Sequence, residues 1–185
     1  MKRLLLLLFA ALVLVGPILA NASVCSFDQF SGAGVVPDGY CDAANWNGQW
    51  SYYDSIQPPY TAHSGAERVY PTGHACCGIM NLNDIVFEGA WFSGYSGLSG
   101  FIQYFLYFQG NVVAANSLNS AVLSDVPYFF SSDYSGPIDR LDIISDANFW
   151  IMDDFTYTAP EPGSLALISS GVLAGVAALR RRYLK

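Results

Sequence analysis

Apolar residues in the central part of the chain recur at every second position, and no window there shows a sustained period of 3.6 residues. Alternation is clearest in residues 84–92, where Ile85, Phe87 and Trp91 fall on one face and the acidic residues on the other. A two-residue period is typical of β-strands, whose successive side chains point to opposite faces of a sheet. The central part is therefore predicted to form sheets with apolar faces.

A second apolar segment, residues 101–108, is nearly continuous and is predicted to be a strand buried on both faces. It is followed by Gly110-Asn111 and then by apolar residues 112–115, which predicts a β-hairpin. Residues 50–69 have weak periodicity and are predicted to form a long loop. Further strands are predicted in the segments 24–30, 35–40, 46–53, 78–82, 126–130, 140–144 and 148–158. Many short strands separated by turn formers indicate an all-β fold, a single antiparallel β-sandwich that is jelly-roll-like.

The N-terminal segment departs from this pattern. Two basic residues precede an apolar run at residues 4–15, and an Ala-Asn-Ala sequence ending at Ala22 fits the small-residue rule for cleavage. Residues 1–22 are therefore predicted to be a signal peptide with an apolar signal helix, and the mature chain is expected to begin at Ser23. An uncleaved N-terminal anchor is the alternative.

The C-terminal segment, residues 159–185, has three parts in a fixed order. Pro160-Glu161-Pro162 comes first, a predicted transmembrane helix covers residues 164–179, and a basic tail of residues 180–185 begins with Arg180-Arg181-Arg182. The uncharged run within this helix would span only roughly 22 Å, which suits a transient anchor better than a permanent one. The basic tail should stay in the cytoplasm, so that the preceding domain faces outward.

This tripartite end resembles the PEP-CTERM sorting signal of Gram-negative bacteria, whose Pro-Glu-Pro motif, apolar helix and basic cluster it matches in order. The resemblance implies that a membrane-embedded exosortase recognises the signal and cleaves near it. The chain would then be only a substrate of exosortase, held transiently in the inner membrane as an anchored precursor. It is expected to end at the cell surface or outside the cell. A plain single-span tail is the alternative.

The part of the chain between the two apolar ends is strongly acidic. Residues 23–159 hold two cations, Arg68 and Arg140, against 14 aspartates and glutamates, which gives a formal charge of −12. A domain with this charge would be repelled by phosphate backbones, so no nucleic-acid partner is expected. Solubility, or binding of divalent cations, fits the charge better.

All four cysteines, Cys25, Cys41, Cys76 and Cys77, lie in the exported part, where an oxidising compartment favours disulfides. Four cysteines allow three pairings, and the sequence does not choose among them. A bond between the adjacent Cys76 and Cys77 would strain the peptide between them, so each is expected to pair with one of the other two. A zinc site built on His74, Cys76 and Cys77 is the less favoured alternative.

Alternation in the last predicted strand places Asp153 on one face with four apolar residues: Phe149, Ile151, Phe155 and Tyr157. A buried carboxylate is costly unless it is paired or bound to a cation. One hypothesis is a structural calcium ion held by Asp153 with Asp28 or with backbone carbonyls. Hydrogen bonds to loop backbone, or a pair with Arg140, are the alternatives, and no other cofactor is expected.

Trp46, Trp50, Tyr52 and Tyr53 form an aromatic cluster in the sequence, beside three side-chain amides. Apolar ring faces flanked by hydrogen-bonding groups match the two sides of a pyranose, so this cluster is a candidate sugar site. Core packing is the favoured alternative in a chain this rich in aromatic residues.

No catalytic constellation stands out, so the chain is not expected to be an enzyme. His63 and His74 lie in a segment punctuated by glycine and proline, no Gly-x-Ser-x-Gly motif is present, and no pair of carboxylates is marked as catalytic.

The central domain, predicted over residues 23–158, also resembles the β-sandwich domains that PEP-CTERM proteins often carry. The residues behind this resemblance are Phe27-Asp28 and the segments 87–92, 138–141 and 152–157. Similar jelly-roll sandwiches include carbohydrate-binding modules. The sequence therefore predicts an exported protein with a structural or adhesive role in exopolysaccharide. A carbohydrate-binding module is the alternative, and a hydrolase is the distant third.

Overall fold

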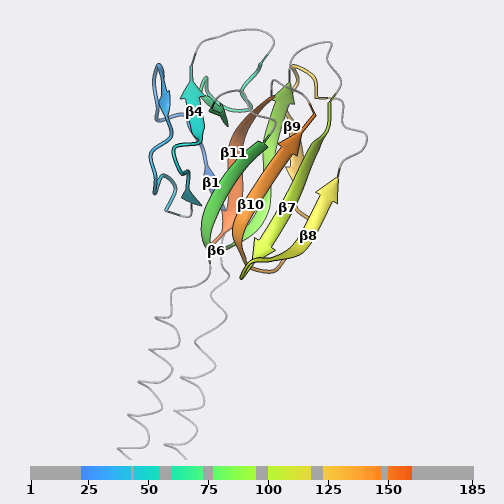
Figure 1. The fold of residues 1–185 in the computed structure, drawn as a ribbon. Helices are drawn as coiled ribbons and strands as arrows, with labels where there is room; N and C mark the ends of the chain where they lie inside the picture. Colours follow the sequence, from blue (N-terminus) through green and yellow to red (C-terminus); the bar gives the residue numbers. More distant parts are fainter. Residues whose placement is uncertain are drawn as a thin grey trace, which may run out of the picture.

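A computed structural model describes residues 22–42, 44–54, 60–72, 77–94, 100–117, 123–146 and 150–159, which form strands and connecting loops with no helix among them (Figure 1). The strands are β1 (Ser23–Cys25), β2 (Ala33–Val35), β3 (Ala44–Asn45), β4 (Trp50–Tyr53), β5 (Arg68–Pro71), β6 (Cys77–Gly94), β7 (Ile102–Phe108), β8 (Asn111–Ser117), β9 (Tyr128–Ser131), β10 (Ile138–Ser145) and β11 (Trp150–Thr158). The predicted all-β fold is confirmed. Within these ranges no helix is long and apolar enough to cross a membrane. The predicted signal helix and C-terminal helix lie outside the described residues.

Every strand pairing is antiparallel, and the principal strand order is β2-β4-β5-β11-β6-β10-β7-β8. The 18-residue β6 runs through both halves of the sandwich. The second half of β6 pairs with β11 and β9. Sheet A consists of this half of β6 together with β1, β2, β4, β5, β9 and β11. The first half of β6 pairs with β10 and β3. Sheet B consists of this half of β6 together with β3, β7, β8 and β10. One strand therefore ties the two layers together.

The core lies between the two sheets and is rich in aromatic side chains. Tyr104 of β7 crosses from sheet B to contact Phe92 and Phe130 of sheet A, with ring centroids 5.9 and 5.8 Å apart. Its hydroxyl donates to the Phe130 carbonyl at 3.1 Å. This bond satisfies the one polar group of a ring that is 1% exposed, as burial requires.

Two irregularities in β6 and β11 decide which side chains enter this core. The pairing register shifts between Asp153 and Thr156 and again between Thr156 and Tyr157, next to Gly89 with φ of 149° and Asp154 with φ of 44°. An extra residue in one strand reverses the alternation beyond it.

The prediction that Trp91 shares a face with Ile85 and Phe87 is therefore wrong. Phe92, not Trp91, enters the core beyond Gly89, and Trp91 lies half-buried on the outer side of sheet A. For the same reason Asp153 does not share a face with Phe155, because Phe155 belongs to the core cluster and Asp153 pairs across from Trp91.

Of the other local predictions, one is confirmed and three are wrong. The β7–β8 hairpin is confirmed, with Gln109 and Gly110 at positive φ in its turn. Residues 101–108 are buried on one face only, not on both. The predicted strand at residues 35–40 ends at Val35, because a turn follows in which Tyr40 N–H donates to the Pro37 carbonyl. The loop predicted over residues 50–69 is wrong at both ends, because β4 covers Trp50–Tyr53 and β5 begins at Arg68.

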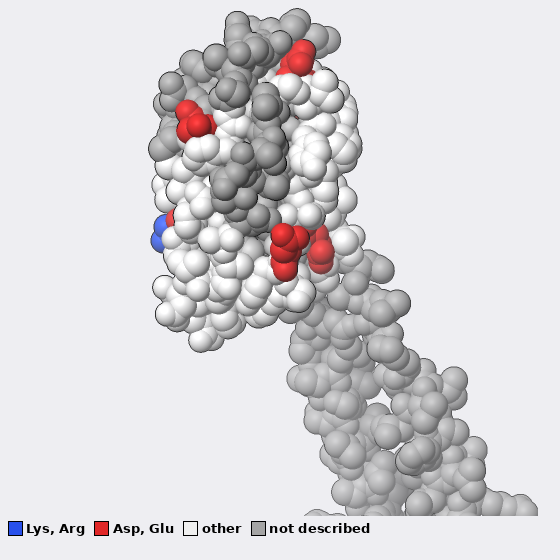
Figure 2. Space-filling model, turned by 90° about the vertical axis from the view of Figure 1, so that its right-hand side faces the viewer, with Lys and Arg blue, Asp and Glu red and all other residues white. Residues whose placement is uncertain are grey.

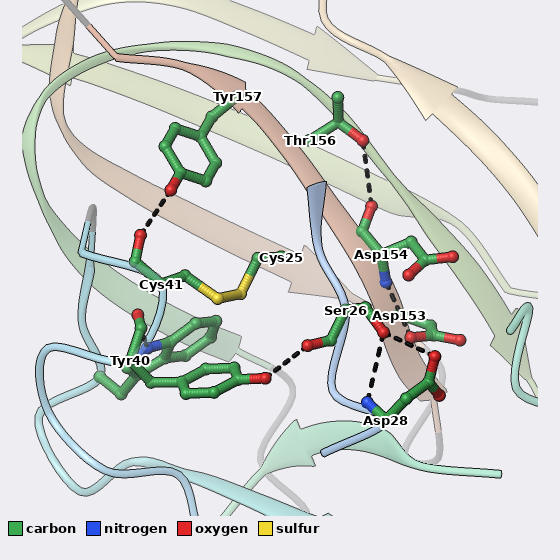
Figure 3. The surroundings of a disulfide bond; sticks show 10 residues. Cys25, Ser26, Asp28, Tyr40, Cys41, Asp153, Asp154, Thr156 and Tyr157 are labelled. Atoms are coloured by element: carbon green, nitrogen blue, oxygen red, sulfur yellow. Dashed lines mark hydrogen bonds between the residues drawn. A yellow bond between two sulfur atoms is a disulfide. The ribbon is translucent and has the colours of Figure 1, made fainter. Parts of the chain in front are cut away.

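One disulfide joins Cys25 to Cys41, whose Cα atoms are 5.6 Å apart (Figure 3). Cys77 is also disulfide-bonded, and its partner lies outside the described residues. The expectation that Cys76 and Cys77 each pair with Cys25 or Cys41 is therefore wrong. Tertiary contacts explain the pairing, because the Tyr157 hydroxyl donates to the Cys41 carbonyl and so holds this loop beside β1.

Gly89→Ala should lower the free energy of unfolding by about 2–4 kcal/mol, because alanine is strained at this φ and its Cβ would lie 2.3 Å from the Phe130 carbonyl oxygen. Gly110→Ala is the control, since Gly110 also has positive φ (77°) but nothing lies within 4 Å of its added Cβ. It should cost only about 1 kcal/mol in the same urea titration. Equal losses from the two substitutions would contradict the proposed backbone clash.

Candidate functional site

The outer surface of sheet B carries side chains that alternate with the core. On β7, Tyr104 and Leu106 point into the core, whereas Phe105 and Tyr107 are half-buried on the opposite face. Two residues along a strand are separated by about 7 Å, so the two rings lie side by side along β7. The strands β6, β10, β7 and β8 lie next to one another and present this surface together (Figure 1).

An ion pair on β10 lies directly beside these rings. The register places Arg140 opposite Tyr107 and Asp142 opposite Phe105. The Arg140 Nε and Nη2 groups donate to the two carboxylate oxygens of Asp142, each at 2.6 Å. The Arg140 guanidinium carbon also lies 4.8 Å from the centroid of the Tyr107 ring. Asp142 raises the pKa of Arg140, and the bidentate pair fixes the orientation of the guanidinium.

Amide side chains border the rings and the ion pair. Asn81 of β6 is paired with Arg140 in the sheet register, is exposed, and donates from its side-chain nitrogen to the Asn47 side-chain oxygen at 3.3 Å. Gln103 of β7 is half-buried and pairs with Ile144. The name "open face" is used below for Asn81, Gln103, Phe105, Tyr107, Arg140 and Asp142.

The open face offers stacking and hydrogen bonding together. Ring faces contact apolar groups, and amides, a guanidinium and a carboxylate supply donors and acceptors in fixed positions. In the view onto the β8 side, acidic atoms of the described residues appear at several places and basic atoms only at one edge (Figure 2). This combination suits a polar ligand that also has an apolar side.

The aromatic cluster predicted as a sugar site lies elsewhere. Trp46 and Trp50 are 0% exposed, and their ring nitrogens donate to the Tyr40 and Ile79 carbonyls at 3.1 and 3.0 Å. Core packing, the favoured alternative, is therefore confirmed for both tryptophans. Tyr52 stacks on Phe30 with centroids 4.3 Å apart and packs against the core.

Asp153, the predicted calcium ligand, is 0% exposed and is held by backbone N–H groups. Its Oδ2 accepts from His63 at 2.8 Å and from Ser64 at 2.9 Å, and its Oδ1 accepts from Asp154 at 2.8 Å. Burial raises the pKa of Asp153 to about 6, with the Asp154 charge adding to the rise and these hydrogen bonds opposing it. The alternative of hydrogen bonds to loop backbone is confirmed, and a pair with Arg140 is not formed, since Arg140 bonds Asp142.

Asp154 binds the same loop through side chains. Its Oδ2 lies 2.7 Å from His63 Nδ1, and its Oδ1 accepts from Ser64 Oγ at 3.0 Å. The His63 ring stacks on Trp91 with centroids 3.5 Å apart. Residues 61–64 thus cover part of the outer side of sheet A, where Ser93 Oγ also donates to the Thr61 carbonyl at 2.9 Å.

Asp28 and Asp153 are brought to the same loop, as the calcium hypothesis requires. Asp28 Oδ2 accepts from Ser64 Oγ at 3.2 Å. It also accepts from Ser26 Oγ at 2.6 Å (Figure 3). Among the described residues, no group of three or more histidine, cysteine or acidic side chains is arranged to hold a metal ion. Calcium at this position stays a prediction. The zinc alternative involves His74 and Cys76, which lie outside the described residues.

By its architecture the chain belongs to the antiparallel β-sandwiches. Residues 158–182 match the family model for the PEP-CTERM protein-sorting motif. The chain thus carries this sorting motif, which indicates an exported protein made as a membrane-anchored precursor. The motif residues Pro160, Glu161 and Pro162 and the basic residues Arg180, Arg181 and Arg182 lie within the match and outside the described part of the structure.

Comparison with solved structures finds low similarity to family 29 carbohydrate binding modules. A mutant of one such module is 19% identical, with 75% of this chain and 91% of that chain covered and a TM-score of 0.39. A structure described as a carbohydrate binding module of family 29 is 16% identical, with 75% and 87% covered and a TM-score of 0.36. No curated protein matches the chain.

Sequence reasoning missed the open face. Two features of the sequence pointed to it. Arg140 and Asp142 lie two positions apart in one predicted strand, and Phe105 and Tyr107 lie two positions apart in another, so each pair shares a face of its strand. Their joint position depends on β10 pairing with β7, which the sequence alone did not specify.

Asp153→Asn should remove one pH dependence of stability. With a pKa of about 6 in the fold against an ordinary 3.8, the folded protein binds more protons than the unfolded chain between about pH 4 and 6. Stability contributed by Asp153 is thus complete below pH 4 and is lost as the pH rises through 6, by at most about 3 kcal/mol. Urea titrations from pH 4 to 7 should show the variant gaining relative to wild type as the pH rises. A constant difference would contradict the assignment.

Proposed function

We propose that this exported protein binds extracellular polysaccharide through the open face and acts as an adhesive or structural component of an exopolysaccharide layer. The observation that carries the proposal is the half-buried Arg140–Asp142 pair, whose guanidinium lies over the Tyr107 ring on the outer surface of sheet B. A pyranose has an apolar side that stacks on a ring and hydroxyls that bond to charged or amide groups. The proposal requires no catalytic residue.

The open face is suited to binding because its side chains are held before a ligand arrives. Phe105 and Tyr107 are fixed on β7 between two paired strands, and Arg140 is fixed by two hydrogen bonds to Asp142. Groups already ordered in the free protein lose little conformational entropy when a ligand binds. Such sites strengthen the binding of a polymer whose single contacts are weak, because its many sugar units can each make the same contact.

The sorting motif supports the cellular side of the proposal. An exosortase is the proposed partner that recognises residues 158–182 in the inner membrane and cleaves near Pro160-Glu161-Pro162. The domain would then leave the membrane and reach the cell surface or the extracellular matrix. Its strong negative charge would keep the released domain soluble.

Tyr107→Ala should weaken binding to a polysaccharide that wild type binds by about tenfold, because one stacking ring is worth about 1.4 kcal/mol. Affinity gel electrophoresis against a panel of soluble polysaccharides measures this change. Tyr128→Ala is the matched control, since Tyr128 is 58% exposed on β9 of sheet A, away from the open face. It should bind like wild type.

Two results would contradict the binding proposal. The first is that wild type is not retarded by any polysaccharide of the panel. The second is that both tyrosine variants bind as wild type does, which would place any sugar site outside the open face.

Mass spectrometry of the exported protein should find a C-terminus near Pro160-Glu161-Pro162, because the sorting motif is proposed to be removed. Peptides from residues 23–158 should be abundant in that fraction. Peptides that run intact from Ala159 to Leu165 in the exported form would contradict the processing step, while leaving the binding proposal in place.

A further inference from the structure

We infer that the polysaccharide bound at the open face is an uncharged one, and that the Arg140–Asp142 pair is what makes the face selective against acidic polymers. This inference rests on the proposed function and narrows it to a class of ligand. An acidic polysaccharide, carrying uronate, sulfate or similar groups, is the competing class.

The first support is that the cation of the open face is already neutralised. Both hydrogen bonds of the pair are 2.6 Å long and join the guanidinium to both oxygens of the same carboxylate. A ligand carboxylate would have to replace Asp142 or share the guanidinium with it, and two carboxylates at one guanidinium repel each other. The side chain of Arg140 is 42% exposed and that of Asp142 13%, so a ligand would reach the guanidinium while Asp142 still holds it from the less exposed side.

The second support is the charge of the whole domain. Residues 23–159 contain one other cation, Arg68, which is 2% exposed and lies on the Tyr53 ring at 4.2 Å in sheet A. It is therefore not available at the open face. The 14 carboxylates of the same residues give a formal charge of −12, which repels an anionic polymer at low ionic strength.

The third support is the kind of group that remains on the open face. Asn81 and Gln103 each supply an amide that both donates and accepts, and Asp142 supplies acceptors. These groups complement hydroxyls, which also both donate and accept. Phe105 and Tyr107 supply faces for the apolar side of a sugar ring, which carries no charge in either class of polymer.

The test is affinity electrophoresis of wild type, Asp142→Asn and Asp139→Asn in gels containing a neutral β-glucan, a neutral galactomannan, alginate or polygalacturonate. Wild type should be retarded by a neutral polymer and not by an acidic one. Asp142→Asn removes the carboxylate that neutralises Arg140, so it should gain at least a severalfold affinity for an acidic polymer at low salt and lose it at high salt.

Asp139→Asn is the matched control, because it removes one negative charge from the same strand. Asp139 accepts from the Gln109 N–H at 2.6 Å and is not part of the Arg140 pair, and an asparagine oxygen there can still accept that bond. It should behave like wild type. If Asp142→Asn does not fold, as judged by its thermal unfolding, the wild-type panel still decides whether the bound polymer is uncharged, and Arg140→Gln, which removes the guanidinium and leaves the carboxylate, tests the pair: it should bind no acidic polymer, and a gain of such binding would overturn the role of the pair.

The outcomes separate the two proposals. Retardation of wild type by an acidic polymer, abolished by Tyr107→Ala, would overturn the uncharged ligand and leave the open face as the binding site. A folded Asp142→Asn that gains no affinity for acidic polymers would overturn the role of the pair. No retardation by any polymer would overturn both proposals.

Discussion

The arrangement of this domain depends on one strand that belongs to both sheets. β6 is hydrogen-bonded to β10 along its first half and to β11 along its second half, so its side chains must serve two layers that face each other. Gly89 makes this possible, because it adopts φ of 149° and lets Phe130 backbone approach where a Cβ would lie 2.3 Å from the carbonyl oxygen. The reversal of alternation at this point turns Phe92 into the core and Trp91 outward.

The reversal of alternation in β6 also makes the outer surfaces of the two sheets different. In sheet A the reversal leaves Trp91 and Asp153 facing outward, and a loop covers them through His63 and Ser64. A carboxylate buried in this way needs backbone donors, which the loop provides. In sheet B, β7 alternates from Ile102 to Tyr107 and β10 from Arg140 to Ser145, and side chains that point away from the core in these stretches form most of the open face. The outer surfaces of the two sheets thus differ because a loop covers sheet A where β6 and β11 are irregular.

The sequence predicted what depends on local pattern and failed where distant segments decide. The all-β fold and the β7–β8 hairpin follow from period two and from Gly110. The faces of Trp91 and Asp153 were wrong, because one extra residue in a strand changes every later position and leaves no sign in hydrophobicity. The pairing of Cys25 with Cys41 depends on contacts with β11, and strain between adjacent cysteines was a poor guide to it.

The residues that match the sorting motif, 158–182, begin at Thr158, the last residue of β11. The last pair of this strand joins Thr158 to Val86, and the strand lies between β5 and β6 in sheet A. Cleavage after Ala159 would remove none of its ladder hydrogen bonds, because every paired residue of β11 precedes that position. Since strand pairs and core contacts supply the stability of a sandwich, the domain would keep its fold after processing. Removal of the sorting segment would then leave the open face of sheet B unchanged, because none of its residues lies on β11.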